Sequence, residues 1–248
     1  MSQTNRAERR SARERLREER ERDRARDRRK RNAKVAAVAV AVLAIATGAG
    51  ILAAGGGGGG DAKGGGEAAR PVSVGEETAP VTLTVYEDFR CPACEQFENT
   101  FRDTLHELTD SGKLRVDYHL VSIIDGNLGG NGSKYAANAA LCARDAGRFR
   151  EYHDVLYTHQ PPETDDDFGD TTRLLDLARQ VEGLDTPAFR SCVEDNAHGE
   201  AVGSANAAFL DSEHSGTPTV LLDGENLYAA DTAPLTPESL RERVNELA

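Results

Sequence analysis

The sequence predicts an α/β domain that contains an inserted helical segment and follows one transmembrane helix. A strand pattern at residues 81–87 is followed by a helix pattern and a second strand pattern at 114–121. After a long helical stretch, β structure returns at 218–228 and a last helix follows. Ahead of all these elements, residues 35–54 carry no charged side chain, as a membrane-spanning helix requires.

The charge of the chain is divided unevenly along its length. The protein has 248 residues and a net charge of −12. Residues 1–34 contain 15 lysines and arginines against seven acidic residues, whereas the remainder contains 15 against 35. Such an asymmetry indicates that the two parts occupy different environments.

Residues 35–54 would separate these two environments. As a helix they would extend about 30 Å, the thickness of a bilayer core. Because basic segments remain on the inside, we expect a cytoplasmic arm and an extracytoplasmic remainder. The alternative is a secretory signal peptide cleaved near Ala53-Ala54, although a signal peptide normally has a short charged region and an apolar region of about 7–15 residues.

The basic arm alternates arginine with acidic residues between Arg6 and Arg31. It could form a helix with ion pairs or have no fixed structure, and it could contact anionic lipids. Nucleic-acid binding is a further interpretation, but the arm has no aromatic residue and adjoins the predicted span. We expect no nucleic-acid partner, and the predicted organisation is a basic arm at 1–34, a transmembrane helix at 35–54, a glycine-rich linker at 55–70 and a folded domain at 71–248.

The folded domain is expected to open with a strand, a helix and a parallel strand. Val81, Leu83 and Val85 share one face of the first strand, which continues to Glu87. A helix should run from Pro92 to about residue 108. A strand–helix–strand order of this kind gives a right-handed crossover.

Residues 127–212 are expected to form the helical insertion. A polar loop at 160–169 interrupts it, and Gly147 should end the first long helix. The insertion should contain helices that begin near Ser133, Phe149, Asp170, Thr186 and Glu200.

The chain should then return to β structure. Residues 218–222 are apolar, Asp223-Gly224 is typical of a two-residue hairpin turn, and 226–228 would form the returning strand. Thr236 and Pro237 have the order of a cap and a first-turn proline. The final helix is expected to present three apolar side chains inward: Leu240, Val244 and Leu247.

The chemistry of the sequence centres on Cys91-Pro92-Ala93-Cys94. Cys91 falls where a strand turns into a helix, so its thiolate would face the positive end of the helix dipole. Zinc binding and a static structural bridge are the alternatives. Zinc would need two more ligands, but the sequence has no second Cys-x-x-Cys and its six histidines are scattered. A redox-active pair is therefore the favoured interpretation, with no metal and no cofactor.

Four motifs carry a resemblance to a known family. They are Glu87-Asp-Phe-Arg-Cys-Pro-Ala-Cys94, Ala139-Ala-Leu-Cys-Ala143, Phe149-Arg-Glu-Tyr-His153 and Gly216-Thr-Pro-Thr219. With these motifs, residues 71–248 resemble the DsbA-like thiol–disulfide oxidoreductases, which have a thioredoxin fold with a helical insertion. The membrane-tethered members with a second cysteine pair are the most similar.

The resemblance implies roles for the residues around the cysteines. Cys91 would be the exposed nucleophile and Cys94 the less accessible thiol that resolves the mixed disulfide. Because Pro92 and Ala93 place no imidazole between the two cysteines, we expect a redox potential less oxidising than about −120 mV, the value of strongly oxidising relatives. Pro218 would be cis and face Cys91, and Thr217 would offer backbone hydrogen bonds to an extended substrate.

The roles of three further residues each have two interpretations. Cys142 and Cys192 lie on the apolar stripes of two predicted helices and would form either a structural disulfide or two buried free thiols. Many family members have a buried acid six residues before the first cysteine, where this chain has Val85. Glu87 shares that strand face and could replace the acid, or it could be an exposed residue at the strand end.

The function implied is disulfide formation in exported proteins by a membrane-anchored enzyme. A DsbB-type protein or a vitamin K epoxide reductase homologue would reoxidise it. Oxidation is favoured over isomerisation because no dimerisation domain is recognisable. The alternatives are a reductase for cytochrome c maturation and a non-catalytic binding module with the thioredoxin fold.

Overall fold

The computed structural model describes residues 70–228 and 234–248. The predicted arm, transmembrane helix and most of the linker lie outside these residues. No helix within the described ranges combines the length and apolar character that crossing a membrane requires.

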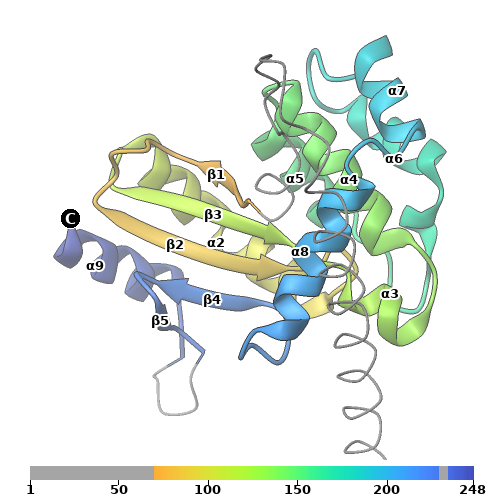
Figure 1. Ribbon diagram of the computed structural model, residues 1–248. Helices are drawn as coiled ribbons and strands as arrows, with labels where there is room; N and C mark the ends of the chain where they lie inside the picture. Colours follow the sequence, from red (N-terminus) through yellow and green to blue (C-terminus); the bar gives the residue numbers. More distant parts are fainter. Residues whose placement is uncertain (1–69, 229–233) are drawn as a thin grey trace, which may run out of the picture. The chain divides into compact units, whose positions relative to one another are not determined.

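A five-stranded mixed sheet forms the centre of the domain, with helices on both faces (Figure 1). The strand order is β1-β3-β2-β4-β5. The strands are β1 (Val72–Val74), β2 (Val81–Glu87), β3 (Leu114–Leu120), β4 (Thr219–Leu222) and β5 (Glu225–Asn226).

The two strands that the sequence predicts first are parallel neighbours, as expected. Val85 of β2 is paired with Tyr118 of β3, and helix α2 (Pro92–Asp110) connects the two strands. On its other side, β2 pairs antiparallel with β4. The short edge strand β1 was not predicted, and it lies antiparallel to β3.

The alternation along β2 gives the sheet one fully buried face. Val81, Leu83, Val85 and Glu87 are all buried, whereas the residues between them are mostly half-exposed. Helix α2 covers this face, and α9 (Pro237–Leu247) packs against α2. Helix α8 lies over the opposite face in Figure 1.

The final helix begins as predicted but differs at its end. Thr236 and Ser239 form a reciprocal capping box, and Leu240 and Val244 are buried. The prediction that Leu247 faces inward is wrong, because its side chain is 55% exposed. It belongs to the last turn, after the helix has passed its neighbours.

The helical insertion lies between β3 and β4. Its caps at Asp170 and Thr186 are confirmed, since their side chains accept hydrogen bonds from the backbone N–H of Thr172 and Phe189. The helices are α3 (Ile123–Leu128), α4 (Gly132–Asp145), α5 (Phe149–Thr158), the 3₁₀ turn η1 (Asp167–Gly169), α6 (Thr171–Ala178), α7 (Pro187–Glu194) and α8 (Gly199–Asp211).

Two features of the insertion differ from the prediction. Helix α3 occupies the start of the insertion, where no helix was expected before Ser133. Ser133 does not cap α4, because the helix starts one residue earlier with Asn131 at the N-cap, and Ser133 is buried in its first turn. Gly147 follows α4 with φ +67°, a conformation that favours glycine and ends the helix.

The predicted hairpin between the last two strands is present. Asp223 and Gly224 both have positive φ, 47° and 88°, as the predicted turn requires. The returning strand is shorter than expected, since β5 contains only Glu225 and Asn226 and Tyr228 lies beyond it.

Candidate active site

Cys91 lies where β2 gives way to α2, as the sequence predicts. It is the N-cap of α2, and Pro92 follows at the first helical position. The Cys91 carbonyl accepts hydrogen bonds from the N–H groups of Cys94 and Glu95, at 3.0 and 3.1 Å. The sulfur therefore sits at the positive end of a 19-residue helix.

The surroundings of Cys91 favour its thiolate. The pKa of Cys91 is lowered to about 6, and a hydrogen bond from Cys94 is the largest cause. Burial acts in the opposite direction, and hydrogen bonds from Thr217 and the first-turn amides lower the pKa further. The expectation that Cys91 is exposed is wrong: only 6% of the residue is accessible. Pro92 and Ala93 are the exposed members of the motif.

Cys94 lies one turn further into the helix and has the opposite character. It is completely buried. Burial first, and then its hydrogen bond to Cys91, raise the pKa of Cys94 well above its ordinary value. At neutral pH the pair therefore consists of one thiolate and one thiol.

The loop before β4 faces Cys91. The Thr217–Pro218 peptide bond is cis, and the Cys91 thiol donates a hydrogen bond to the Thr217 carbonyl at 3.3 Å. The Thr217 hydroxyl is buried and has no other partner, so it is available to donate to the Cys91 thiolate. The sequence motifs at 91–94 and 216–219 are thus brought together.

A groove of about 550 Å³ opens beside this loop. It is lined by residues 213–219, by residues of the β4–β5 hairpin and by Tyr228. The Tyr228 ring lies at the edge of Phe97 on α2, with centroids 6.4 Å apart. An extended polypeptide laid in this groove would pass beside the Thr217 backbone, next to the Cys91 sulfur.

Arg90 fixes the chain immediately before the motif. It is 1% exposed, and its guanidinium donates to Asp125 Oδ1 and to the Gly129 carbonyl at 2.8 Å each. It also bonds the Glu163 carbonyl at 3.0 Å and pairs with Asp166. A single side chain thus joins the start of α2 to two separate parts of the insertion.

Asp88 and Gln160 complete this support. Asp88 accepts from the N–H groups of Arg90 and Ile124, both at 2.9 Å, and burial raises its pKa to about 6. Gln160 donates from one amide nitrogen to the carbonyls of Phe89 and Cys91, at 2.8 and 3.1 Å. Sequence reasoning missed Gln160, which it placed in a polar loop, because a loop amide gives no periodic signal.

Glu87 is not the exposed strand-end residue of the alternative interpretation. It is completely buried, and its Oε1 lies 2.8 Å from Nε2 of His153. Its charge acts on the Cys94 thiol. Glu98 completes a buried group in which ligand-type atoms of Glu87, Glu98 and His153 lie within 4.8 Å of one another.

The sequence contained a signal for both additional members of this group. Glu98 is four residues after Cys94, on the buried stripe of α2, and His153 ends one of the four resemblance motifs. Such a group could hold a metal ion. The short Glu87–His153 contact is instead that of a hydrogen-bonded, proton-sharing pair.

The second cysteine pair is a disulfide, as one of the two alternatives predicted. Cys142 of α4 and Cys192 of α7 are joined with an S–S distance of 2.02 Å and a Cα–Cα distance of 5.9 Å. The bridge lies inside the helical insertion and closes a separation of 50 residues. It takes no part in the arrangement around Cys91.

The family model described as thioredoxin matches residues 67–246. DsbA from Mycobacterium tuberculosis, solved in its oxidised form, is 31% identical, with 71% of this chain and 92% of that chain covered and a TM-score of 0.60. A probable disulfide bond formation protein D from Bacillus cereus is 25% identical over 155 residues, which are 61% of this chain and 69% of the relative.

A relative of a different kind is also similar. The Na(+)/H(+) antiporter NhaA 3 of Salinispora tropica is 35% identical over 153 residues, covering 60% of this chain. The chain spans only about a fifth of that relative's length, 21%.

Proposed function

Because the chain belongs to the thioredoxin family, among the DsbA-like thiol–disulfide oxidoreductases, we propose that it forms disulfides in exported proteins through the Cys91–Cys94 couple. The observation that carries this proposal is the contrast between the two thiols. The pKa of Cys91 is lowered to about 6, while burial raises that of Cys94.

The reaction would follow from this contrast. In the oxidised protein, a substrate thiolate attacks the Cys91 sulfur, the Cys91–Cys94 bond breaks, and Cys94 leaves with the electron pair. A second substrate thiolate then attacks the substrate sulfur of the mixed disulfide and releases Cys91 as its thiolate. The low pKa of Cys91 makes it a good leaving group in this second step.

The same pKa bears on the potential. Stabilising the thiolate stabilises the reduced form and makes the disulfide more oxidising. A pKa of about 6 lies between those of thioredoxin, about 7, and DsbA, about 3.5. We therefore propose a potential between their values of about −270 and −120 mV, which equilibration with glutathione buffers measures.

Substrate binding is proposed at Thr217 and Pro218. The Thr217 carbonyl lies 3.3 Å from the Cys91 sulfur and the groove of about 550 Å³ continues from it. Backbone hydrogen bonds at this loop would hold an extended segment without reading its sequence, which suits an enzyme that acts on many exported chains.

The location and partners are also proposals. The uncharged segment at 35–54 and the net negative charge of residues 55–248 favour a single-pass anchor with a cytoplasmic N-terminus. A membrane reoxidant, either a DsbB-type protein or a vitamin K epoxide reductase homologue, would accept electrons from the reduced pair. Labelling of an engineered cysteine at position 3 or 60 with a membrane-impermeant reagent on intact cells tests the topology.

Glu87 is proposed as the buried acid that serves Cys94 in place of Val85. It is buried on the same strand face, and its charge acts on the thiol. Glu87→Gln with an unchanged pH–rate profile would refute this role.

One pair of assays separates the proposed function from its rivals. Oxidised full-length protein should catalyse refolding of a reduced, disulfide-containing substrate, and Cys91→Ser should lose this activity. Insulin reduction without refolding activity would instead indicate the reductase, and activity in neither assay would indicate a binding module.

A further inference from the structure

The buried group behind Cys94 draws its members from three elements. Glu87 comes from β2, Glu98 from α2 and His153 from α5. All three are nearly inaccessible, at 0%, 3% and 2% exposure. A proton that enters or leaves this group must therefore pass through neighbouring side chains.

The group must contain at least one mobile proton. Glu87 Oε2 and Glu98 Oε1 are both buried and have no hydrogen-bond partner. One carboxylate oxygen of each residue nevertheless lies within 4.8 Å of the other, and two carboxyl groups this close in a buried site are not both ionised, so one of them holds a proton. Burial first, and then the Glu87 charge, raise the pKa of Glu98 well above its ordinary value.

His153 carries a second proton and has two different neighbours. Burial opposes its charged form, but Glu87 and Asp154 outweigh that effect and raise the pKa of His153 to about 10. Its Nε2 lies 2.8 Å from Glu87, and its Nδ1 points the other way, 3.9 Å from Asp154 Oδ1. The imidazole ring thus lies between the buried carboxyl groups on one side and the Asp154 carboxylate on the other.

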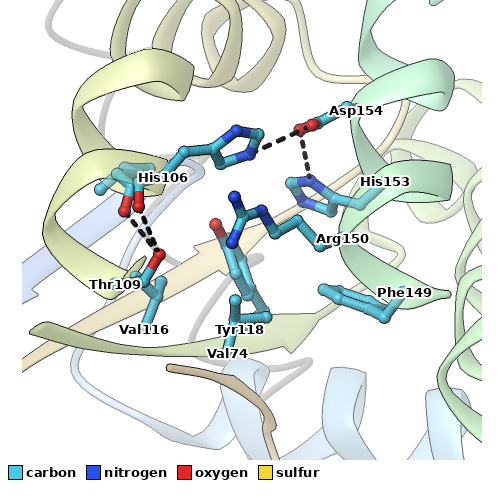
Figure 2. Close-up of a pocket in the computed structure, with 10 residues that line it drawn as sticks. Val74, His106, Thr109, Val116, Tyr118, Phe149, Arg150, His153 and Asp154 are labelled. Atoms are coloured by element: carbon cyan, nitrogen blue, oxygen red, sulfur yellow. Dashed lines mark hydrogen bonds and ion pairs between the residues drawn. The ribbon is translucent and has the colours of Figure 1, made fainter. Parts of the chain in front are cut away.

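On that far side, Asp154 lies between His153 and His106 (Figure 2). Asp154 Oδ2 lies 3.1 Å from Nε2 of His106, and the side chains of Asp154 and His106 are 24% and 30% exposed. A cavity of about 10 Å³ is lined by His153, Asp154 and His106, which is close to the space that one water molecule needs. Burial alone would raise the pKa of Asp154, but the hydrogen bonds from His106 and His153 hold this pKa below its usual range.

The inner end of this series reaches the resolving thiol. Cys94, Glu98, Arg102 and His106 follow one another at intervals of four along α2, so they lie on one side of the helix. The 15 positions from Cys91 to His106 correspond to about 22 Å of helix. The surface end therefore lies far along α2 from Cys91.

We propose that Glu87, Glu98 and His153 form a proton relay that connects the buried Cys94 thiol to solvent beside Asp154 and His106, far along α2 from Cys91. This rests on the redox function proposed above. In this relay, His153, Asp154 and His106 are positioning and proton-transfer residues. They do not contact the reacting sulfur atoms.

The protons balance in both directions. When Cys94 closes the ring, its sulfur attacks Cys91 of a mixed disulfide, the external thiolate leaves, and the Cys94 proton enters the carboxyl pair. A proton then leaves Nδ1 of His153 for the solvent beside Asp154, so the number of protons on the group is unchanged. When the ring opens, the Cys94 thiolate takes a proton from the carboxyls and the flow reverses.

The pH dependence of the relay involves every ionisable side chain that faces it. These side chains come from β2 and the loop after it, from α2, β3 and α5, and from the segment after β5. They are Glu87, Asp88, Cys94, Glu98, Arg102, His106, Tyr118, Arg150, His153, Asp154, Tyr157 and Tyr228.

The test separates the two chemical steps of reoxidation. Reduced full-length protein in mild detergent is mixed with glutathione disulfide between pH 4.5 and 9, quenched with acid, and analysed by mass spectrometry. The first step, attack by Cys91, gives the glutathione mixed disulfide. The second step is ring closure by Cys94. We expect Asp154→Asn to slow the second step about tenfold, below the effect of removing a direct acid or base, and to leave the first step unchanged.

His106→Gln should slow ring closure by a smaller factor, and added imidazole should restore the rate because the side chain lies at the surface end. Asp110→Asn is the matched control, since this exposed acid also bonds α2 to α5, through Arg150, but not to His153. It should leave both steps unchanged.

Ring closure at the wild-type rate in both Asp154→Asn and His106→Gln at every pH would overturn the relay. Equal slowing of both steps would also overturn it, because it would indicate a structural effect. Cys94→Ser must accumulate glutathione on Cys91. If it does not, the proposed function has failed, and this result is independent of the relay variants.

Discussion

The two cysteine pairs consist of the same type of residue but lie at opposite ends of helices. Cys91 is the N-cap of α2, where the dipole favours a thiolate. Cys142 and Cys192 lie in the last turns of α4 and α7, where the dipole disfavours one. We therefore expect the position of a cysteine along its helix to separate a reactive pair from an inert bridge.

The loops that the pairs close also differ. Two residues separate Cys91 from Cys94, while Cys142 and Cys192 are 50 positions apart. Closing a long loop removes more conformational entropy from the unfolded chain. The first pair is thus suited to opening and closing, and the second to stabilising the insertion.

The largest expected difference concerns activity. Cys91→Ser should reduce catalysed refolding to the uncatalysed rate, because the proposed reaction has a substrate thiolate attack the Cys91 sulfur, which lies 3.3 Å from the Thr217 carbonyl. The double variant Cys142→Ser/Cys192→Ser should retain activity within about twofold at 25 °C, as its bridge supplies only stability. Refolding rates with equal amounts of folded protein test this contrast, and comparable losses in the two variants would break it.

The second difference concerns stability. Removing the Cys142–Cys192 bridge should lower the free energy of unfolding by about 4 kcal/mol, the chain-entropy value for a loop of this size. Urea denaturation of oxidised samples measures it. A change below about 1 kcal/mol would mean that the unfolded chain is already constrained in this region.

A third difference concerns thiol reactivity in the reduced protein. Because the pKa of Cys91 is lowered to about 6 and that of Cys94 is raised, alkylation at pH 7 should modify Cys91 at least about a hundredfold faster. Iodoacetamide labelling followed by mass spectrometry should show half-maximal reactivity of Cys91 near pH 6.

The same shift makes stability depend on pH. The folded pKa of Cys91 lies below its ordinary value of 9.0, so the thiolate stabilises the reduced form fully above pH 9. This contribution decreases as the pH falls and is lost near pH 6. The difference in Tm between reduced and oxidised protein should follow this curve, whereas the Cys142–Cys192 bridge should add no pH dependence.

The smallest expected effect isolates the support of the reactive pair. Gln160→Ala removes two hydrogen bonds, to the carbonyls of Phe89 and Cys91. It should lower the free energy of unfolding by about 1–2 kcal/mol. It should also raise the pKa of Cys91 slightly by loosening the first turn of α2. Gln180→Ala, in the turn after α6, is the control, and an equal effect there would argue against a specific role for Gln160.

Much of this architecture could be predicted from local sequence. The strand at 81–87, the caps at Asp170, Thr186 and Thr236, and the Asp223-Gly224 turn each have a short-range physical signal, and the structure contains all of them. The cysteine motif likewise fixes its own position at the start of a helix.

The parts that were missed depend on distant contacts. Strand β1 has three residues and pairs only because β3 offers it an edge. Helix α3 forms in a glycine-containing segment because Asp88 binds the Ile124 N–H from 36 positions away. Glu87 is buried against His153 of the insertion, and Cys91 is buried beside the loop at Thr217, contacts that no local pattern reveals.

We expect Arg90 to link the timing of folding to reactivity. Its guanidinium is shared among Asp125, Gly129, Glu163 and Asp166, which come together only when the insertion has folded. We expect the low-pKa thiol to emerge late, once these partners are assembled, so that a nascent chain would not yet exchange disulfides with its neighbours. Alkylation pulses during refolding would show when that maturation occurs.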